Sequence, residues 1–323
     1  MNPAVFIDAI QTELQRTDYG QHPPELYDPI RYIMSLGGKR MRPLLTLMST
    51  YLFTDNWQRA VRPALGVEVF HNFTLMHDDI MDRAPLRRGK PTVHEKWNDN
   101  IAILSGDVML VNAYDLLLDV DVDKLKSILA RFSRTAAEVC EGQQMDMNFE
   151  TRWDVTEAEY VEMIRLKTSV LLGYALELGG LIAGADAETN RHLYESGVNI
   201  GIGFQLKDDL LDVYGDPAKF GKQVGGDIIA NKKTFLLIEA LEKATGPIRD
   251  ELTGWLARTN FNKAEKVAAV TTIYDQLGIR QITRSRINEY FERGFANLEQ
   301  VVAEPARKAV LGDFARQLVE RES

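Results

Sequence analysis

The spacing of hydrophobic residues along the chain is helical almost throughout. Apolar residues recur at three- and four-residue intervals over long segments, the pattern of helices with a buried face. Strand-like alternation is scarce, and no Asn-Gly pair marks a hairpin. The pattern therefore predicts an all-α fold. The segments that show this periodicity are Val61–Met81, Ile101–Leu118, Leu125–Met147, Glu157–Ala183 and Arg191–Val213.

Residues with strong capping preferences place several helix ends. Thr156 followed by Glu159 has the pattern of a capping box, in which each residue satisfies a backbone N–H of the other. Asp186 is placed to cap the next long helix, and Gly215-Asp216-Pro217 ends it, because proline cannot continue a helix.

No Ser-, Pro- or Gly-rich linker divides the chain. We expect loops at Arg83–Pro91, at Asp216–Asn231 and around Thr245–Pro247. Helices that are long and rich in apolar residues are best packed as one bundle. The prediction is a single all-α domain over residues 1–323, a helical bundle around a central cavity.

Composition narrows the class of protein. The chain has 323 residues, of which 45% are hydrophobic, enough for a large core. Asp and Glu number 47 against 38 Lys and Arg, a net charge of -9. This balance argues against a nucleic-acid-binding protein. The single cysteine, Cys140, can form no internal disulfide, and we expect it to be a buried small apolar residue.

Neither a signal peptide nor a membrane span is indicated. The first residues, MNPAVFIDAIQTELQR, include acidic residues and lack the apolar core and cleavage site of a signal peptide. The longest apolar stretch, Val170–Ala185, is interrupted by Glu177 and falls short of the ~20 residues that a spanning helix needs. We expect a buried core helix here and a cytoplasmic protein.

Two segments of the chain resemble each other and carry the candidate chemistry. FTLMHDDIMD at 73–82 and GFQLKDDLLD at 203–212 each place two Asp, two apolar residues and a third Asp late in an apolar helix. Helix residues four apart lie on one face, so the first and last Asp of each segment project together. Such carboxylates repel one another unless a cation neutralises them, and Mg²⁺ prefers these hard oxygen ligands. Taken alone, each cluster would more often be a solvated helix end.

Basic residues complement the two acidic motifs. Arginine suits bidentate contacts with phosphate, while lysine acts as a point charge. His71 and His77 have no metal-site spacing, and each alone would be a structural histidine. A lysine inside an apolar helix, Lys167, needs a partner. The basic residues in question are Lys39, Arg42, Arg87, Arg88, Lys90, Lys167, Lys222, Lys232 and Lys233.

Taken together, these motifs resemble those of the head-to-tail trans-polyprenyl diphosphate synthases, in the order found in that family. The resemblance spans about 200 residues, while the part from about Gly246 matches only as a generic helical region. The matching motifs are GGKRMRP (37–43), HNFTLMHDDIMD (71–82), LRRGKPTVH (86–94), GQQMD (142–146), LKT (166–168), FQLKDDLLD (204–212), GKQVGGD (221–227) and NKKT (231–234).

The resemblance implies an isoprenoid-synthase bundle, usually a homodimer, with three Mg²⁺ ions bridging the acidic motifs and an allylic diphosphate. Substrates would be isopentenyl diphosphate and dimethylallyl, geranyl or farnesyl diphosphate. By the resemblance, the direct metal ligands are Asp78, Asp82 and Asp208, and the supporting carboxylates are Asp79, Asp209 and Asp212. The allylic-diphosphate ligands are Arg87, Lys167, Lys222 and Lys232. The isopentenyl-diphosphate ligands are Lys39, Arg42, His71 and Arg88, and the polar groups near the allylic cation are Thr168 and Gln205.

Product length is expected to depend on Phe73, five residues before Asp78, about 7.5 Å along a helix. An aromatic residue there resembles a floor that stops growth of the chain. The next residue, Thr74, is not aromatic, and the first motif has no insertion. These features favour a C20 product, with C15 as the nearest alternative. The expected mutational outcome is that Phe73→Ala lengthens the product.

Two other activities remain open at this point. A terpene cyclase shares the fold, but would normally replace the second acidic motif with an Asn/Ser/Glu triad and would not need the second basic set. A non-catalytic subunit of a synthase heterodimer tends to lose motif residues, and none is lost here. One departure from the family pattern is Asn231, often Gly in the family, which bears on the role of Lys232.

Overall fold

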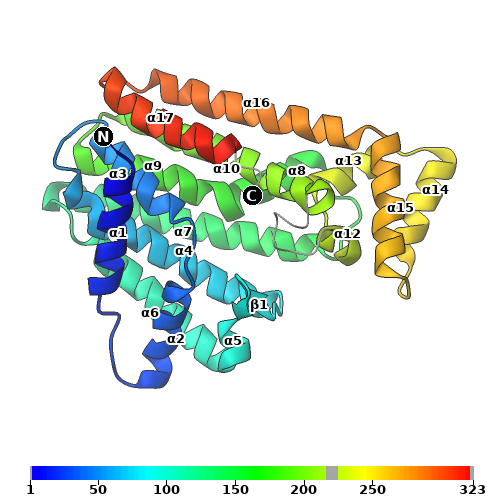
Figure 1. Cartoon of the computed structure of the whole chain (residues 1–323), viewed down its shortest axis with the longest axis horizontal. Coiled ribbons are helices and arrows are strands. Elements are labelled where there is room, and N and C mark those ends of the chain that lie inside the picture. The colour runs from blue at the N-terminus through cyan, green and yellow to red at the C-terminus, as the bar shows by residue number, and fades with distance from the viewer. Residues whose placement is uncertain (1, 216–224, 321–323) are drawn as a thin grey trace. The chain divides into compact units, whose positions relative to one another are not determined.

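The structure, a computed structural model, describes residues 2–215 and 225–320 (Figure 1). In these residues helices predominate, and the strands are a single antiparallel pair of two residues each. The prediction of an all-α fold is confirmed. The chain divides into two compact units, which we describe one at a time.

Unit 1 comprises Met1–Arg134, Tyr174–Tyr194 and Val301–Phe314, and unit 2 comprises Thr135–Gly173, Glu195–Gln300 and Ala315–Ser323. Elements wholly in unit 1 are α1 (Ala4–Arg16), α2 (Pro24–Ser35), α3 (Met41–Tyr51), the 3₁₀ turn η1 (Trp57–Ala60), α4 (Val61–Met81), β1 (Leu86–Arg87), β2 (Lys90–Pro91), α5 (Val93–Lys96) and α6 (Asp99–Leu117). Elements wholly in unit 2 are α8 (Glu157–Ile164), the π-helical turn η2 (Arg165–Ser169), α12 (Gly226–Ala230), α13 (Phe235–Lys243), α14 (Gly246–Ala257), α15 (Lys263–Gln276) and α16 (Ile279–Gln300). Helices with residues in both units are α7 (Val122–Phe149), α9 (Val170–Ala183), α10 (Ala187–Tyr214) and α17 (Pro305–Glu320).

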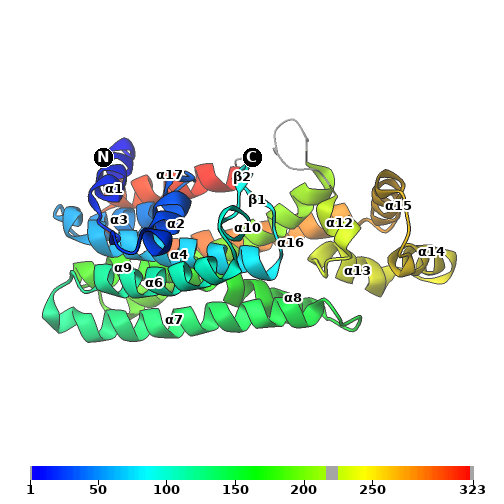
Figure 2. The ribbon, with the colours of Figure 1, turned by 90° about the horizontal axis from the view of Figure 1, so that it is seen from below.

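Helix α4 forms the core of unit 1. Its residues from Pro63 to Phe70 are all buried, as expected for a stretch that is apolar apart from Glu68. Helix α6 lies beside it (Figure 2). Gly66 permits this approach, because a Cβ atom there would lie 3.0 Å from the carbonyl oxygen of Ala113. The acidic end of α4 is thereby fixed by a packed helix.

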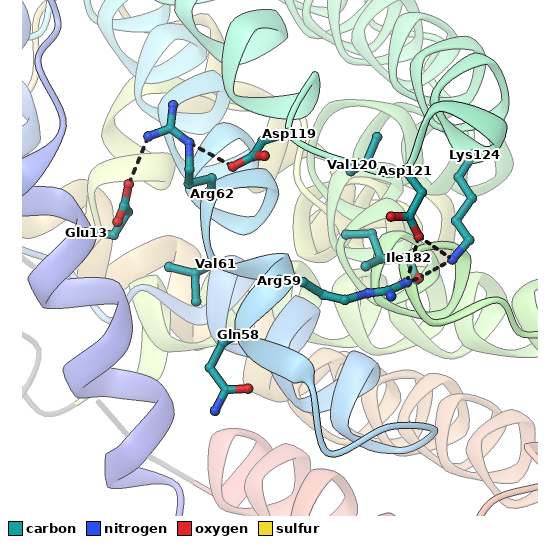
Figure 3. Close-up of a pocket in the computed structure, with 10 residues that line it drawn as sticks. All are labelled: Glu13, Gln58, Arg59, Val61, Arg62, Asp119, Val120, Asp121, Lys124 and Ile182. Carbon is teal, nitrogen blue, oxygen red and sulfur yellow. Dashed lines mark hydrogen bonds and ion pairs between the residues drawn. The ribbon is translucent and has the colours of Figure 1, made fainter.

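A polar pocket of about 400 Å³ lies in unit 1 (Figure 3). Its cations serve the structure: Lys124 Nζ donates to the carbonyl oxygen of Ile182 at 2.9 Å, and Arg59 donates to the same oxygen. They satisfy a backbone acceptor at the end of α9 that has no partner within the helix. Asp121 lies 3.1 Å from Lys124 and 3.3 Å from Arg59. The charged residues that line the pocket thus cap the end of α9, and Asp121 balances the charge of the two cations.

In unit 2, glycines allow helices to approach closely. A Cβ atom at Gly201 of α10 would lie 2.8 Å from Ser169, and one at Gly203 would lie 2.6 Å from the ring of Phe291 in α16. Gly142 of α7 faces the backbone of Lys167 in η2 in the same way. A π-helical turn carries one residue more than an α turn and frequently occurs at functional sites. This packing fixes the segment that contains Lys167 and Thr168.

The C-terminal part of unit 2 contains an antiparallel pair, α14 and α15, which lie side by side in both views (Figures 1 and 2). Helix α12 packs against α15. Asn262 caps α15, because its side chain accepts from the backbone N–H groups of Ala264 and Glu265. The short α12, directly before Lys232, therefore rests on a capped helix.

The expected helices are confirmed, with ends shifted by a few residues at most. The segment Val61–Met81 matches α4 in full, and the segment Glu157–Ala183 contains α8, η2 and α9 in succession. Thr156 and Glu159 form the predicted capping box. Asp186 accepts from the backbone N–H of Thr189 at 2.8 Å, as predicted for a cap.

Three local expectations were wrong. The expected loop Arg83–Pro91 contains the β1–β2 pair, which its two-residue turn allows because Arg88 and Gly89 both have positive φ. The expected loop Asp216–Asn231 contains helix α12 in its described part. Cys140 is exposed, because Val139 and Gly142 are the buried residues on this turn of α7 and Cys140 points away from them.

Two helical stretches are long and apolar enough to cross a membrane by length and composition alone. In Glu157–Ala183, 78% of the most apolar window is buried, as expected for a core helix. In Asp99–Leu117 the buried share is 39%. The exposed apolar residues of that second stretch, α6, therefore need another explanation.

Candidate active site

The first acidic motif lies at the C-terminal end of α4 in unit 1. Asp79 is buried and forms a bidentate pair with Arg87, whose Nε and Nη2 atoms lie 2.8 and 2.7 Å from the two carboxylate oxygens. Burial raises the pKa of Asp79, and Arg87 opposes that rise. Arg87 Nη2 also lies 3.8 Å from Asp78 Oδ2. The side chain of Asp78 is partly accessible and that of Asp82 is exposed, so these two carboxylates are the ones that can reach an ion.

The β1–β2 turn directs two consecutive arginines to different partners. Arg87 binds the acidic motif, while Arg88 donates a hydrogen bond to the carbonyl oxygen of Gly37 in the GGKRMRP segment. Arg88 has a φ of 53°, a left-handed conformation that is uncommon for a residue with a Cβ atom. The turn thus links the segment at 37–43 to the first acidic motif.

The charges of four arginines in unit 1 act on His71. Burial, followed by the charges of Arg42, Arg88, Arg87 and Arg40, holds the pKa of His71 well below its usual range. The ring is therefore neutral at pH 7, so it adds no charge of its own to the group. A neutral hydrogen-bonding ring among guanidinium groups favours an anionic ligand. Three residues predicted to bind one diphosphate, Arg42, His71 and Arg88, are brought together, while Lys39 is exposed.

Arg40 is a residue of this site that the sequence alone did not single out. It adopts a left-handed conformation with φ 47°, and its Nη1 lies 2.6 Å from Oε1 of the buried Glu68. Its Nη2 donates to the carbonyl oxygen of Met34 at 2.6 Å. Arg40 therefore anchors the segment from which Lys39 and Arg42 project. Its position between Lys39 and Arg42 is the one feature of the sequence that could have identified it. Its pairing with Glu68 could not be predicted, because the two residues are far apart in the sequence.

The second acidic motif lies near the C-terminal end of α10 in unit 2. Asp209 is buried, accepts from Tyr160 Oη, and accepts from Gln205 Nε2 at 3.2 Å. Burial, and then the charge of Asp227, raise the pKa of Asp209 to about 7. Asp208 is exposed, whereas Asp212 Oδ2 accepts from the backbone N–H of Asp227 at 3.0 Å. Asp208 is thus the most accessible carboxylate of this motif.

One carboxylate of α7 gathers two of the predicted lysines. Lys167 Nζ lies 2.7 Å from Asp146 Oδ2, and Lys232 Nζ lies 3.9 Å from the same oxygen. Burial alone would raise the pKa of Asp146, but Lys232 and Lys167 hold it below its usual value. Asp146, the last residue of the GQQMD motif, is the partner that the charge of Lys167 required.

Thr168, the residue after Lys167, donates to Gln205 Oε1 at 3.4 Å, and Gln205 in turn contacts Asp209. The predicted residues Lys167, Thr168, Gln205 and Lys232 therefore lie in one network in unit 2. Lys222 lies outside the described residues. Tyr160 joined the network without a sequence signal, because its contact with Asp209 crosses 49 positions of the chain.

The donor set suits Mg²⁺. In the described part of the chain no three His, Cys, Asp or Glu side chains gather as a ready metal cluster. A Mg²⁺ ion bound by one or two carboxylates together with substrate phosphates needs no such cluster. Asp78 and Asp82 in unit 1, and Asp208 in unit 2, offer hard oxygen atoms that remain accessible. The carboxylates of each unit thus fit Mg²⁺ bound together with a diphosphate.

The chain is similar over most of its length to known proteins. A family model described as polyprenyl synthetase matches residues 23–274. A geranylgeranyl diphosphate synthase of Methanosarcina mazei is 38% identical over 99% of this chain and 96% of its own length. A crystal structure of a geranylgeranyl pyrophosphate synthase superposes with a TM-score of 0.95, at 47% identity, over 100% of both chains. A geranylgeranyl pyrophosphate synthase of Corynebacterium glutamicum, complexed with isoprenyl diphosphate and magnesium, has a TM-score of 0.85 at 29% identity and covers 99% of this chain and 98% of its own.

Proposed function

This chain belongs to the polyprenyl synthetase family and is a trans-prenyltransferase that makes short prenyl diphosphates. From this premise we propose the reaction that it catalyses. The reaction joins isopentenyl diphosphate head to tail with an allylic diphosphate, and C20 is the favoured product. The observation that carries it is the pairing, in each unit, of accessible carboxylates with a cluster of cations. A diphosphate bridged by divalent ions needs both kinds of group.

The residues divide between two substrates. Arg42, His71 and Arg88 of unit 1, with Lys39, would bind isopentenyl diphosphate. Arg87, Lys167 and Lys232, with Lys222, would bind the allylic diphosphate. Asp78, Asp82 and Asp208 would hold Mg²⁺, three ions in each active site, with Asp79, Asp209 and Asp212 in support. When bound, Mg²⁺ supplies the positive charge that stabilises a leaving diphosphate.

Catalysis follows from the placement of charge. Lys167 and Lys232 already share one carboxylate oxygen of Asp146, so an incoming diphosphate would meet two ammonium groups held side by side and could form a charge-assisted contact with each. As the allylic C–O bond ionises, the negative charge passes to the diphosphate that these lysines hold. Thr168 and Gln205, already hydrogen-bonded to each other, would face the cation. The double bond of isopentenyl diphosphate attacks, and the released diphosphate accepts the proton.

Incubation with Mg²⁺, isopentenyl diphosphate and each allylic starter tests the activity. We expect a prenyl diphosphate whose formation requires isopentenyl diphosphate and stops when EDTA removes the metal. A cyclised hydrocarbon formed from the allylic substrate alone would instead identify a terpene cyclase. No turnover without a second kind of subunit would identify a non-catalytic partner.

A homodimer is the proposed assembly. Helix α6 and its C-cap residue expose a row of large apolar side chains, each between 42% and 58% accessible: Ile103, Leu104, Val111 and, at the C-cap, Leu118. Such a patch on a core helix is typical of an interface. We assign it to a second copy of this chain, because homo-oligomers with twofold symmetry are the commonest assemblies of soluble enzymes. The proposed location is the cytoplasm.

A further inference from the structure

A lysine of the C-terminal part of unit 2 is completely buried although no predicted role uses it. Lys266, in the first turns of α15, has a relative exposure of 0%. Its Nζ donates to Asn231 Oδ1 at 2.6 Å and to the carbonyl oxygen of Ile229 at 3.3 Å. Its ammonium group also lies over the ring of Phe261, 4.3 Å from the centroid. Burying an ammonium group is costly, so a specific contact must compensate.

Both hydrogen-bond acceptors belong to one structural feature, the C-terminal end of α12. Ile229 lies in the last turn of that helix, and Asn231 is its C-cap with φ 54° and ψ 33°. That left-handed conformation is the usual way to end a helix, and it is filled by Gly or, less often, by Asn. Lys266 therefore supplies a donor to a helix end whose carbonyl groups lack partners within the helix. Burial lowers the pKa of Lys266.

Asn231 is held on its other side as well. Its Nδ2 donates to the carbonyl oxygen of Leu256, near the end of α14, at 3.0 Å. The side chain thus bridges α14 and α15, which pack against each other. This explains why Asn is present where the family often has Gly: the residue adopts the glycine-like backbone and adds two anchors.

The opposite end of α12 is fixed by the acidic helix. The backbone N–H of Asp227 donates to Asp212 Oδ2, and the carbonyl oxygen of Asp227 accepts from the backbone N–H of Lys232 at 2.9 Å. Helix α12 is therefore a strut, held by Asp212 at its start and by Lys266 at its end. Lys232 follows the C-cap residue Asn231, and its Nζ lies 3.9 Å from Asp146 Oδ2.

We infer that Lys266 is a positioning residue: by clamping Asn231 at the end of α12, it sets where Lys232 stands beside Lys167 and Asp146. The inference rests on the proposed function in one respect, namely that Lys232 binds the allylic diphosphate. It gives the α14–α15 pair, which carries no motif, a role in the binding of substrate.

The central variant is Lys266→Met, which keeps the length of the side chain and removes the donor. The amide hydrogens of residues 229–234 should exchange faster with deuterium, and KM for the allylic diphosphate should rise about tenfold, the scale expected for one charge-assisted hydrogen bond. KM for isopentenyl diphosphate should stay within about twofold, since Lys232 is not among its proposed ligands. Lys263→Met, an exposed lysine one turn earlier on α15, is the matched control and should change neither.

Rescue separates positioning from general stability. Asn231→Gly in the Lys266→Met background restores a residue that ends a helix without help from a side chain, and KM for the allylic diphosphate should return to within about threefold of the parent value. If Lys266→Met fails to fold, Lys266→Gln replaces it; the side chain is shorter and uncharged, so exchange at 229–234 and KM for the allylic diphosphate should rise in the same direction by a smaller factor. Unchanged deuterium exchange at residues 229–234 would overturn the inference. It would also be overturned if exchange rose throughout the protein, both KM values rose together, and Asn231→Gly restored neither.

The two proposals fail in different ways. If the parent protein has no prenyltransferase activity, the proposed function is wrong, but the exchange of residues 229–234 still decides whether Lys266 clamps α12. If Lys232→Ala leaves KM for the allylic diphosphate unchanged, the inference about Lys266 as a positioning residue for that substrate is wrong.

Discussion

At the residue scale, several charged side chains of the candidate site act by holding other charged side chains. One carboxylate oxygen of Asp146 lies near two lysines. Arg87 donates to both carboxylate oxygens of Asp79. In each pair both members belong to motifs that are separate in the sequence, and each fixes the position of the other. Asp78 and Asp208 lie next in sequence to the buried carboxylates of Asp79 and Asp209 and remain accessible to a metal ion and substrate.

Asp78→Ala and Asp208→Ala should each lower turnover by two orders of magnitude or more, because a lost metal ligand removes charge stabilisation from the leaving group. Initial rates at saturating substrate measure this, and circular dichroism should show unchanged helical content. Asp250→Ala, an exposed aspartate of α14, is the control. Near-normal turnover in either motif variant would contradict the assigned metal roles.

Arg40→Met should destabilise unit 1, because it leaves Glu68 buried without its charged partner. The side chains of this pair are 12% and 3% exposed, and breaking such a pair costs about 3 to 5 kcal/mol. Urea unfolding measures the difference.

Arg31→Met is the comparison for that experiment, because it breaks an exposed pair with Asp28 and should cost less than about 1 kcal/mol. The double variant Arg40→Met/Glu68→Met should recover most of the loss, since no unpaired charge then stays buried. A double variant as unstable as the single one would show that packing, and not charge, sets the cost.

At the element scale, the long helices were predictable and the contacts between them were not. The periodicity of Val61–Met81 and the cap at Thr156 are local properties, so the sequence contains them in full. The hairpin at 86–91 was missed because its strands are too short for any alternation to appear. Tyr160 and Glu68 were missed because each acquires its role from a partner distant in sequence. The motif residues were found because they lie near one another along the chain.

Phe73→Ala should lengthen the product, but the structure indicates a limit to this effect. Phe73 packs on Phe70 with ring centroids 5.5 Å apart, and Phe70 packs on Phe132 of α7 at 5.1 Å. In Phe73→Ala the rings of Phe70 and Phe132 therefore remain and should still limit the growth of the chain. Chromatographic sizing of the products should show extension by few isoprene units in Phe73→Ala and further extension when Phe70→Ala is added. An unchanged product distribution in both variants would exclude Phe73 as the determinant of length.

At the scale of the whole molecule, the exposed apolar row of α6 decides the proposed assembly. Val111→Glu places a charge at its centre, where Val111 is 58% exposed, and should convert a dimer to a monomer in sedimentation velocity, because a buried unpaired carboxylate is costly. Val302→Glu, at an 83% exposed valine outside α6, is the matched control and should leave the dimer intact. A parent protein that sediments as a monomer would refute the assignment of this surface.

The π-helical turn at Arg165–Ser169 has a consequence for how this protein tolerates change. An α-helix advances about 100° per residue, so deletion of one residue from this turn would let the helix continue as a regular spiral at almost no cost to its own hydrogen bonds. Lys167 and Thr168 would nevertheless rotate away from Asp146 and Gln205. A chain shortened in this way should stay helical, but Lys167 would no longer face Asp146. The extra residue of the turn therefore sets the direction in which Lys167 and Thr168 point.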